Sequence, residues 1–306
     1  MQANVVVVGS LNMDLVTRTE RLPRPGETIF GQSFDTVHGG KGANQAVAAA
    51  RLGARVAMLG CVGGDAYGLQ LRQGLLDEHI DCQAVRTVLN GVSGVALITV
   101  GANSQNTIVV VPGANACLTP QDLQIFDGML QDAKVVICQL EVPMDTVGYT
   151  LSRGRELGKV VILNPAPASG PLPELWYDAI DYLIPNESEA GALSGVAVDS
   201  LESAEMAARQ LIGFGARKII VTLGAQGALF VSAQRVVHFA APKVEALDAT
   251  AAGDTFVGAF AAALARGEGE EEAIRFAQIA AALSVTCAGA QPSIPRLSDV
   301  RGFVAP

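Results

Sequence analysis

The residues whose types and spacing best suit chemistry lie in one short polar run, residues 248–256. The run holds Asp248 and Asp254, a Gly just before the second Asp, and small Ala and Thr residues. It precedes residues 257–266, an apolar segment rich in Ala, Phe and Leu that predicts a buried helix. The run therefore lies at a helix N-terminus, where backbone N–H groups lack partners inside the helix and the helix dipole adds partial positive charge.

This position favours phosphoryl transfer. Small side chains let an anion approach the free N–H groups, so Ala251, Ala252, Gly253 and Asp254 can form an anion hole. Asp254 is expected to stay ionised in the positive field and to accept a hydroxyl proton, while the hole takes the developing charge. The alternative is that Asp254 or Thr255 only caps the helix.

A second cluster lies near the other end of the chain, where Gly39, Gly40, Lys41 and Gly42 precede an Ala-rich helical stretch at 43–52. The spacing differs from that of a phosphate-binding P-loop, because position 35 is Asp and position 42 is Gly. The glycines let the backbone approach a small ligand, while Lys41 supplies a cation and Asn44, inside the helical stretch, supplies an amide. The alternative for Lys41 is an exposed loop lysine.

Other polar residues follow predicted strands. Asn12 and Asp14 come after the β-branched run at 5–8, and Glu141 comes after a strand predicted at 134–138. Ligands of open α/β sheets bind at such strand ends, although turn formers and a solvated loop residue are the alternatives.

A capping-box spacing, Asn-x-x-Glu, joins Asn186 to Glu189 and predicts a helix start there. Gly224 and Gly227 follow a strand predicted at 218–223 and give a weak signal for a phosphate or adenine contact.

These residues need a scaffold, and strands alternating with helices predict a parallel sheet covered on both faces. Residues 228–232 and 236–239 are interpreted as edge strands. Two segments interrupt the alternation and predict two pairs of strands, residues 15–37 around a Pro-Gly turn and residues 94–111. The expected strands are 5–8, 56–60, 134–138, 159–163 and 218–223, and the expected helices are 43–52, 67–77, 120–130, 145–157 and 273–287.

Composition excludes several classes. The net charge of −9 argues against a nucleic-acid surface. Five scattered cysteines without a C-x-x-C pair indicate a reducing compartment, and the absence of a basic leader or of an apolar run of about 18 residues indicates a cytoplasmic protein outside membranes. The three histidines show no triad or metal spacing, and neither a G-x-S-x-G elbow nor a dinucleotide fingerprint occurs.

Residues 248–256 and 39–46 resemble the C-terminal and N-terminal signatures of the ribokinase family of carbohydrate and nucleoside kinases. The two motifs stand more than two hundred residues apart in the family's order. The resemblance implies a three-layer α/β/α fold with a mainly parallel central sheet. It also implies one domain over residues 1–306, with a β-sheet lid from 13–37 and 94–111. Family members often bury that lid against a second subunit, which implies a homodimer.

The resemblance also implies a reaction, the transfer of phosphate from ATP to O5 of D-ribose with Asp254 as the general base. It implies that Mg²⁺ accompanies ATP, with Glu189 orienting its water, and that K⁺ activates. The implied sugar ligands are Asn12, Asp14, Gly40, Lys41, Gly42, Asn44, Glu141 and Asp254. The implied ATP contacts are Asn186, Thr222, Gly224, Gly227, Gly253 and Gln278. The implied K⁺ ligands, mostly through backbone oxygen, are Asp248, Thr250, Ser284, Cys287, Gly289 and Ser293.

Two alternatives stay open. The first is a kinase of another small sugar or a nucleoside, such as deoxyribose, fructose or adenosine. Residues 10–44 contain two Phe and no Trp or Tyr to stack on a base, which favours a bare sugar. The second is a non-catalytic sugar-binding regulator, which could lose Asp254 or Gly253. Ala249 stands where many family members carry a second Thr.

Overall fold

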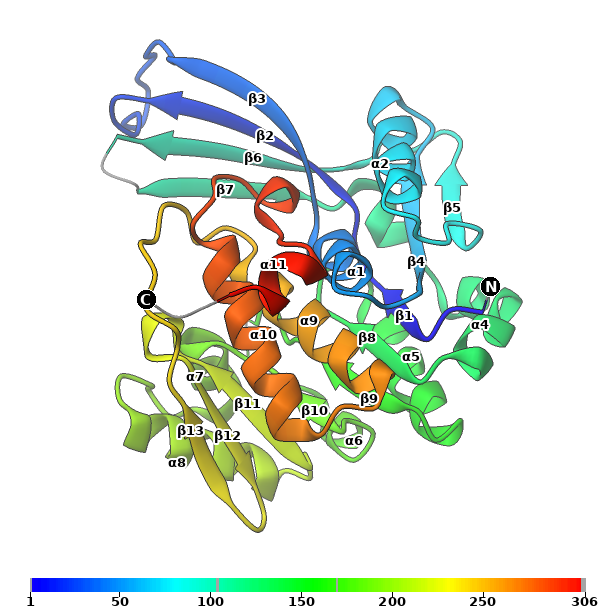
Figure 1. The fold of residues 1–306 in the computed structure, drawn as a ribbon. Coiled ribbons are helices and arrows are strands. Elements are labelled where there is room, and N and C mark those ends of the chain that lie inside the picture. Colours follow the sequence, from blue (N-terminus) through cyan, green and yellow to red (C-terminus); the bar gives the residue numbers. More distant parts are fainter. Residues whose placement is uncertain (1, 103–104, 169, 304–306) are drawn as a thin grey trace.

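The computed structural model describes residues 2–102, 105–168 and 170–303, and a nine-stranded sheet runs through its centre (Figure 1). The strand order is β13-β12-β11-β10-β9-β8-β1-β4-β5. Neighbours pair in parallel except at one edge, where β12 is antiparallel to β11 and β13. The strands are β1 (Val5–Val8), β4 (Val56–Gly63), β5 (Val85–Val88), β8 (Val135–Cys138), β9 (Val160–Leu163), β10 (Tyr182–Leu183), β11 (Lys218–Thr222), β12 (Ala228–Ser232) and β13 (Val236–Phe239).

Helices cover both faces of this sheet. Side chains alternate between the two faces of a strand, so Val5 and Val7 of β1 enter one hydrophobic cluster while Val6 and Val8 enter the other. The first cluster contains α1 (Lys41–Arg51), α2 (Ala66–Asp77), α9 (Ala252–Arg266) and α10 (Glu270–Ser284). The second contains α3 (Pro120–Ile125), α4 (Asp127–Asp132), α5 (Met144–Glu156), α6 (Glu174–Tyr177), α7 (Glu187–Ser194) and α8 (Leu201–Gly213). The expected three-layer α/β/α fold is confirmed.

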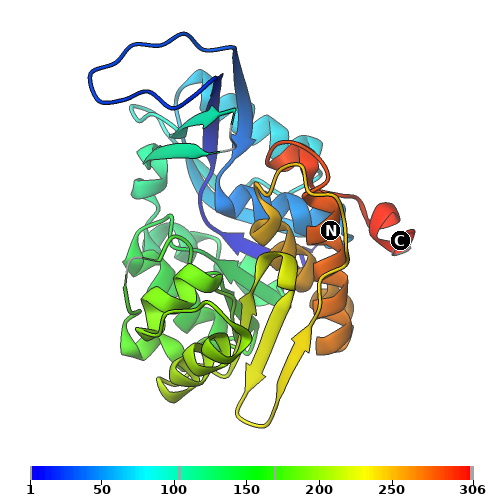
Figure 2. The same cartoon turned by 90° about the vertical axis from the view of Figure 1, so that its left-hand side faces the viewer.

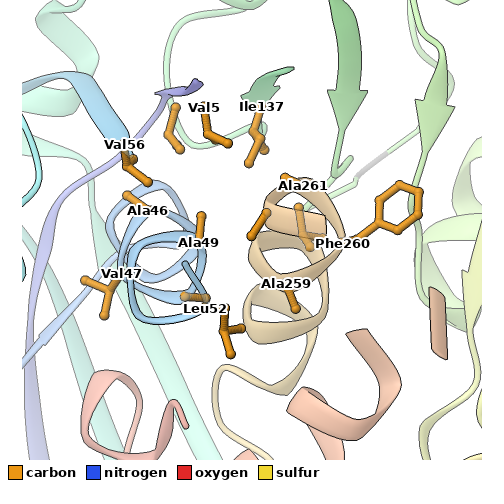
Figure 3. Close-up of a cluster of buried hydrophobic side chains, with 14 of the residues drawn as sticks. Val5, Ala46, Val47, Ala49, Leu52, Val56, Ile137, Ala259, Phe260 and Ala261 are labelled. Atoms are coloured by element: carbon orange, nitrogen blue, oxygen red, sulfur yellow. The ribbon is translucent and has the colours of Figure 1, made fainter. Parts of the chain in front are cut away.

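The contact between α1 and α9 positions the site. Figure 3 shows alanines of both helices together below Val5 and Ile137 of the sheet. A Cβ atom on Gly258 of α9 would lie 2.5 Å from Ala48 Cβ and 2.6 Å from the Gln45 carbonyl oxygen of α1. Only small residues allow this approach, so the two ends of the sequence meet along one close helix contact.

A separate four-stranded sheet forms the lid and projects from the core (Figures 1 and 2). Its order is β3-β2-β6-β7, and β2 runs parallel to β6. These strands are β2 (Asn12–Thr19), β3 (Ser33–Gly39), β6 (Gly94–Gly101) and β7 (Asn106–Val111). The predicted lid is confirmed, and its strands β2 and β6 start side by side because Asn12 pairs with Gly94.

Several predicted elements differ in detail. Helix α9 begins at Ala252, five residues before the prediction, because Ala251 adopts a left-handed conformation (φ 60°) and turns the chain in one step. The helix expected at 120–130 is divided at Phe126, where its backbone leaves helical geometry. Strand β12 lies inside the sheet, paired on both sides. The helix expected at 273–287 is α10, which begins three residues earlier and ends three residues earlier.

The remaining short elements complete the chain. They are α11 (Leu297–Arg301) and three 3₁₀ turns, η1 (Gly113–Cys117), η2 (Gly224–Gln226) and η3 (Gln291–Ser293). Across the described ranges, every helix is too short or too polar to cross a bilayer.

Candidate active site

A pocket of about 210 Å³ opens where the carboxyl ends of β9, β10 and β11 meet the first turns of α1, α7 and α9. Ligands of open α/β sheets bind at this edge. The pocket brings together Lys41, Asn186, Glu189, Thr222 and Asp254, residues from motifs that are far apart in the sequence. Its other lining residues are Asn164, Ala166, Ile184, Ala249, Ala251, Ala252, Gly253 and Val257.

The first turn of α9 leaves backbone donors free at this pocket. Ala251 is the N-cap, and no side chain caps the helix. Within the described residues, the N–H groups of Gly253 and Asp254 have no acceptor, whereas Ala252 N donates to Ala249 O at 3.2 Å. A Cβ atom on Gly253 would meet no protein atom within 4 Å. The glycine therefore leaves room on the pocket side, and the arrangement fits a phosphate group.

Asp254 is buried, with 7% of its surface exposed, and two side chains of α1 hold its carboxylate. Asn44 Nδ2 donates to Oδ2 at 3.0 Å and Gln45 Nε2 donates to Oδ1 at 2.9 Å. The helix-capping alternative does not describe this geometry, because the carboxylate bonds to another helix rather than to its own first turn.

Acidic side chains surround Lys41 on the lid side of Asp254. Glu141 accepts hydrogen bonds from Lys41 N at 3.0 Å and from the Ser10 hydroxyl. Burial, then the charges of Glu141 and Asp254, raise the pKa of Asp14 to about 7, against the opposing effect of Lys41. Burial alone would lower the pKa of Lys41, but the surrounding carboxylates raise it, so this ammonium stays charged.

Asn12 is oriented by Asn115, a residue that no motif in the sequence singled out. Asn115 Nδ2 donates to Asn12 Oδ1 at 2.7 Å, while Asn115 also bonds the N–H and the carbonyl of Leu11. A Cβ atom on Gly94 would lie 2.2 Å from Asn12 Oδ1, so the lid strand β6 must approach here without a side chain. Among the residues that the structure describes, none accepts a hydrogen bond from the Asn12 amide nitrogen, which leaves it available to a ligand.

The backbone conformation and close backbone contacts explain why glycines occur in the N-terminal motif. Gly40 has a φ of 88° as N-cap of α1, and a Cβ atom there would lie 2.7 Å from Asn12 N. A Cβ atom on Gly42 would lie 2.5 Å from Ser10 N. Both glycines therefore let the start of α1 pack on the end of β1, which brings Lys41 to the pocket.

Both readings of the Asn186-x-x-Glu189 motif agree with the geometry. Asn186 Oδ1 accepts from Glu189 N at 2.8 Å, and Glu189 Oε2 accepts from Asn186 N at 2.9 Å, which completes a capping box. Both side chains also line the pocket. Burial raises the pKa of Glu189, and the hydrogen bond from Asn186 and the charge of Lys41 oppose that shift.

The expected nucleotide contacts meet at the β11–β12 turn. Gly224 and Gly227 both have positive φ, and a Cβ atom on Gly227 would lie 2.0 Å from Phe239 O. Gln278 Nε2 donates to the same carbonyl at 2.6 Å. Thr222 ends β11 and lines the pocket, whereas Gly224, Gly227 and Gln278 lie outside its lining.

The two segments of the expected K⁺ site also touch. Asp248 Oδ2 accepts from Gly289 N at 2.9 Å, and Asp248 Oδ1 accepts from the N–H and hydroxyl of Thr250. Burial would raise the pKa of Asp248, but these hydrogen bonds lower it. Ser284 and Ser293 direct their hydroxyls to nearby backbone carbonyls, and Cys287 is exposed. No group of three or more His, Cys, Asp or Glu side chains in the described ranges is arranged as a metal site.

Comparisons with known proteins agree with this fold. The sequence profile of the pfkB family of carbohydrate kinases matches residues 2–297. The chain is 41% identical over 307 residues to a ribokinase of Haemophilus influenzae and 38% identical over 302 residues to a deoxyribokinase of Salmonella typhi, covering 99% of both chains each time. It resembles a structure of Arabidopsis thaliana ribokinase complexed with ribose and ATP, with a TM-score of 0.91, 34% identity and coverage of 99% of this chain and 100% of that one.

Proposed function

This chain belongs to the pfkB family of carbohydrate kinases, and we propose that within the family it transfers the γ-phosphoryl group of ATP to O5 of D-ribose. The observation that carries the proposal is the juxtaposition of Asp254 with the free N–H groups of Gly253 and Asp254. A proton acceptor and an anion site then lie in the same pocket, which is what phosphoryl transfer to a hydroxyl requires.

In the proposed reaction, the ribose 5-hydroxyl attacks the γ-phosphorus in line and gives its proton to Asp254. The bond from that phosphorus to the bridging oxygen breaks, and ADP leaves. The N–H groups of Gly253 and Asp254 donate to oxygens of the transferring phosphoryl group. Lys41 adds positive charge in the pocket, where it lies among carboxylates.

Sugar recognition is assigned to the polar residues between the lid and α1. The free amide nitrogen of Asn12 and the carboxyl of Asp14 lie on β2, and Asn44 lies beside Asp254. Gly40, Gly42 and Glu141 complete the proposed set by shaping and fixing the start of α1. Because a deoxyribokinase is also similar over the whole chain, the 2-hydroxyl is the decisive group of the substrate.

The residues proposed to hold Mg²⁺ and those proposed to hold K⁺ offer different kinds of oxygen ligand. Mg²⁺ keeps several waters and takes few protein ligands, and Glu189 supplies a carboxylate at the pocket that could orient such a water. When bound, Mg²⁺ would neutralise charge on the phosphates. K⁺ would be held by the linked turns at Asp248 and Gly289, with the carbonyls of Thr250, Ser284, Cys287 and Ser293 as the other proposed ligands.

The lid supports a further proposal, a homodimer that covers its outer strand. Every residue of β7 is exposed, including Ile108, Val109, Val110 and Val111. Light scattering should find a dimer, which Val109→Lys should dissociate, whereas Leu69→Lys on the exposed face of α2 should not. A monomeric wild type would contradict the proposal.

A coupled assay of ADP release tests the activity with ribose, deoxyribose, fructose and adenosine. Ribose should give the highest kcat/KM. Asp254→Asn keeps the shape of the side chain but removes the proton acceptor, so kcat should fall by at least ~100-fold while ribose affinity changes little. Retention of more than about a tenth of the wild-type kcat would refute the base assignment.

A further inference from the structure

A chain of buried carboxamides holds Asp254 from the core side of α1, and one of its members, Asn164, also lines the pocket. Gln45 Nε2 donates to Asp254 Oδ1 at 2.9 Å and to Asn164 Oδ1 at 2.9 Å. Gln45 Oε1 accepts from Gln139 Nε2 at 2.6 Å. Gln45 and Gln139 have no exposed surface, and they come from α1 and from the segment after β8.

One backbone carbonyl fixes the polarity of this network. The Ile184 carbonyl can only accept, and Asn164 Nδ2 donates to it at 2.9 Å. The side-chain oxygen of Asn164 therefore faces Gln45. Gln45 must present its NH₂ group to that oxygen as the donor. The second N–H of that group then points at Asp254 Oδ1, and the Gln45 oxygen faces Gln139.

The hydrogen bonds and packing of this network fix the orientation of the Gln45 amide. Both N–H donors of Gln45 are engaged, so its amide cannot turn without breaking two hydrogen bonds. A Cβ atom on Gly9 would lie 2.1 Å from Gln139 Oε1, so Gln139 fills the space up to the β1 backbone. Within the described residues Gln139 Oε1 has no hydrogen-bond partner, which is unfavourable in a buried site. A core selected only for stability would place apolar side chains here.

We propose that Gln45 is a positioning residue for phosphoryl transfer: it holds the Asp254 carboxylate in a fixed orientation through Oδ1, while Oδ2 accepts from Asn44 beside the pocket. The proposal rests on the proposed function, because it assigns Gln45 a role through Asp254. Gln45 is fully buried and is not one of the residues that line the pocket, so its effect falls on the chemical step rather than on sugar binding. Asn44 differs, because it lies beside the pocket and is assigned to the sugar.

Gln45→Met tests the assignment, since it keeps length and volume but removes both donors. We expect kcat at pH 7 to fall about 10- to 100-fold, the loss typical of a hydrogen bond to a charged group. The sugar KM should stay within about threefold, because the sugar ligands keep their places. A donor to a carboxylate favours its ionised form, so the acid limb of the kcat–pH profile should move to higher pH, with part of the rate recovered there.

Thr150→Val is the matched control, because the buried Thr150 hydroxyl donates to Thr146 O within α5, away from the pocket. It should lower the unfolding temperature without moving the pH profile. If Gln45→Met does not fold, Gln45→Asn replaces it, since the shorter amide cannot reach both acceptors. A wild-type pH profile in a folded Gln45 variant, or a rise in sugar KM with unchanged kcat, would overturn the proposal.

The outcomes separate this inference from the proposed function. If the wild type phosphorylates another sugar instead of ribose, the substrate assignment fails and the Gln45 profile is measured on that sugar. If Asp254→Asn stays active, the base assignment fails, and the role given to Gln45 fails with it. If both of those hold but the Gln45 variants match Thr150→Val, only the positioning role is refuted.

Discussion

Gly253→Ala should make the protein slightly more stable and much less active. Gly253 lies inside the first turn of α9, its φ is not in the left-handed region, and an added Cβ would meet no protein atom within 4 Å. Replacing Gly by Ala inside a helix stabilises by about 0.5–1 kcal/mol. For a chain of 306 residues, that gain raises the unfolding temperature by about 1–1.5 °C.

The cost appears in catalysis, because the open side of Gly253 is the pocket. A methyl group there stands in front of the free N–H groups of Gly253 and Asp254 and displaces the phosphoryl group from them. A displacement of about 1 Å can lower the rate by roughly 100-fold, and loss of one oxyanion donor has a similar effect. We therefore expect kcat to fall by about 100-fold with the sugar KM little changed.

The measurements are thermal unfolding followed by circular dichroism and steady-state kinetics at saturating ATP and Mg²⁺. Gly213→Ala is the control, because Gly213 ends α8 and an added Cβ there also meets nothing within 4 Å, but it lies outside the pocket. It should raise stability without changing kcat. Full activity of Gly253→Ala would refute the assignment of the anion site to the first turn of α9.

Three further predictions follow from the site. Glu189→Gln should raise the Mg²⁺ concentration needed for half-maximal rate, while the cap geometry survives; a change in thermal stability alone would leave Glu189 as a cap only. K⁺ should raise kcat several-fold over Na⁺ at matched ionic strength, and equal rates in K⁺, Na⁺ and a bulky organic cation would exclude the cation site. Asp14→Asn should raise the unfolding temperature more at pH 8 than at pH 5. The pKa of Asp14 is about 7 in the folded protein and 3.8 in model peptides, so ionisation of Asp14 lowers stability as pH rises through that window. An equal gain at both pH values would contradict this.

The candidate site residues could be selected from the sequence because their chemistry is local. Glycines and small residues beside Lys41 and Asp254 indicate where a ligand can approach the backbone closely. The Asn186-x-x-Glu189 spacing indicates a helix N-cap. The same local character explains the error at α9. Ala is a strong helix former, and no feature of the sequence indicates that Ala251 adopts a left-handed conformation. The helix was therefore expected to begin later.

The residues that were missed act through distant partners. Asn115 lies 103 residues from Asn12, and Gln139 lies 94 residues from Gln45. No spacing rule connects such pairs, because only the packed fold makes them neighbours. Gln45 stood inside the N-terminal motif, yet its sequence position does not reveal that its amide faces Asp254 instead of the sugar. Strand β12 shows the same limit, since an apolar run does not reveal whether one or two neighbours flank it.

The contact between α1 and α9 has a consequence for the order of events on the ribosome. Asn44 and Asp254 are 210 residues apart in the chain. At about 5–20 residues per second, synthesis takes on the order of 10–40 s to pass from one to the other. During that interval the side-chain amides of Asn44 and Gln45 have no Asp254 carboxylate to bind, and the face of α1 that α9 covers in the folded protein is exposed. The nascent protein therefore cannot catalyse its reaction until its C-terminal helices emerge. A chaperone that shields the exposed face of α1 would act in that interval.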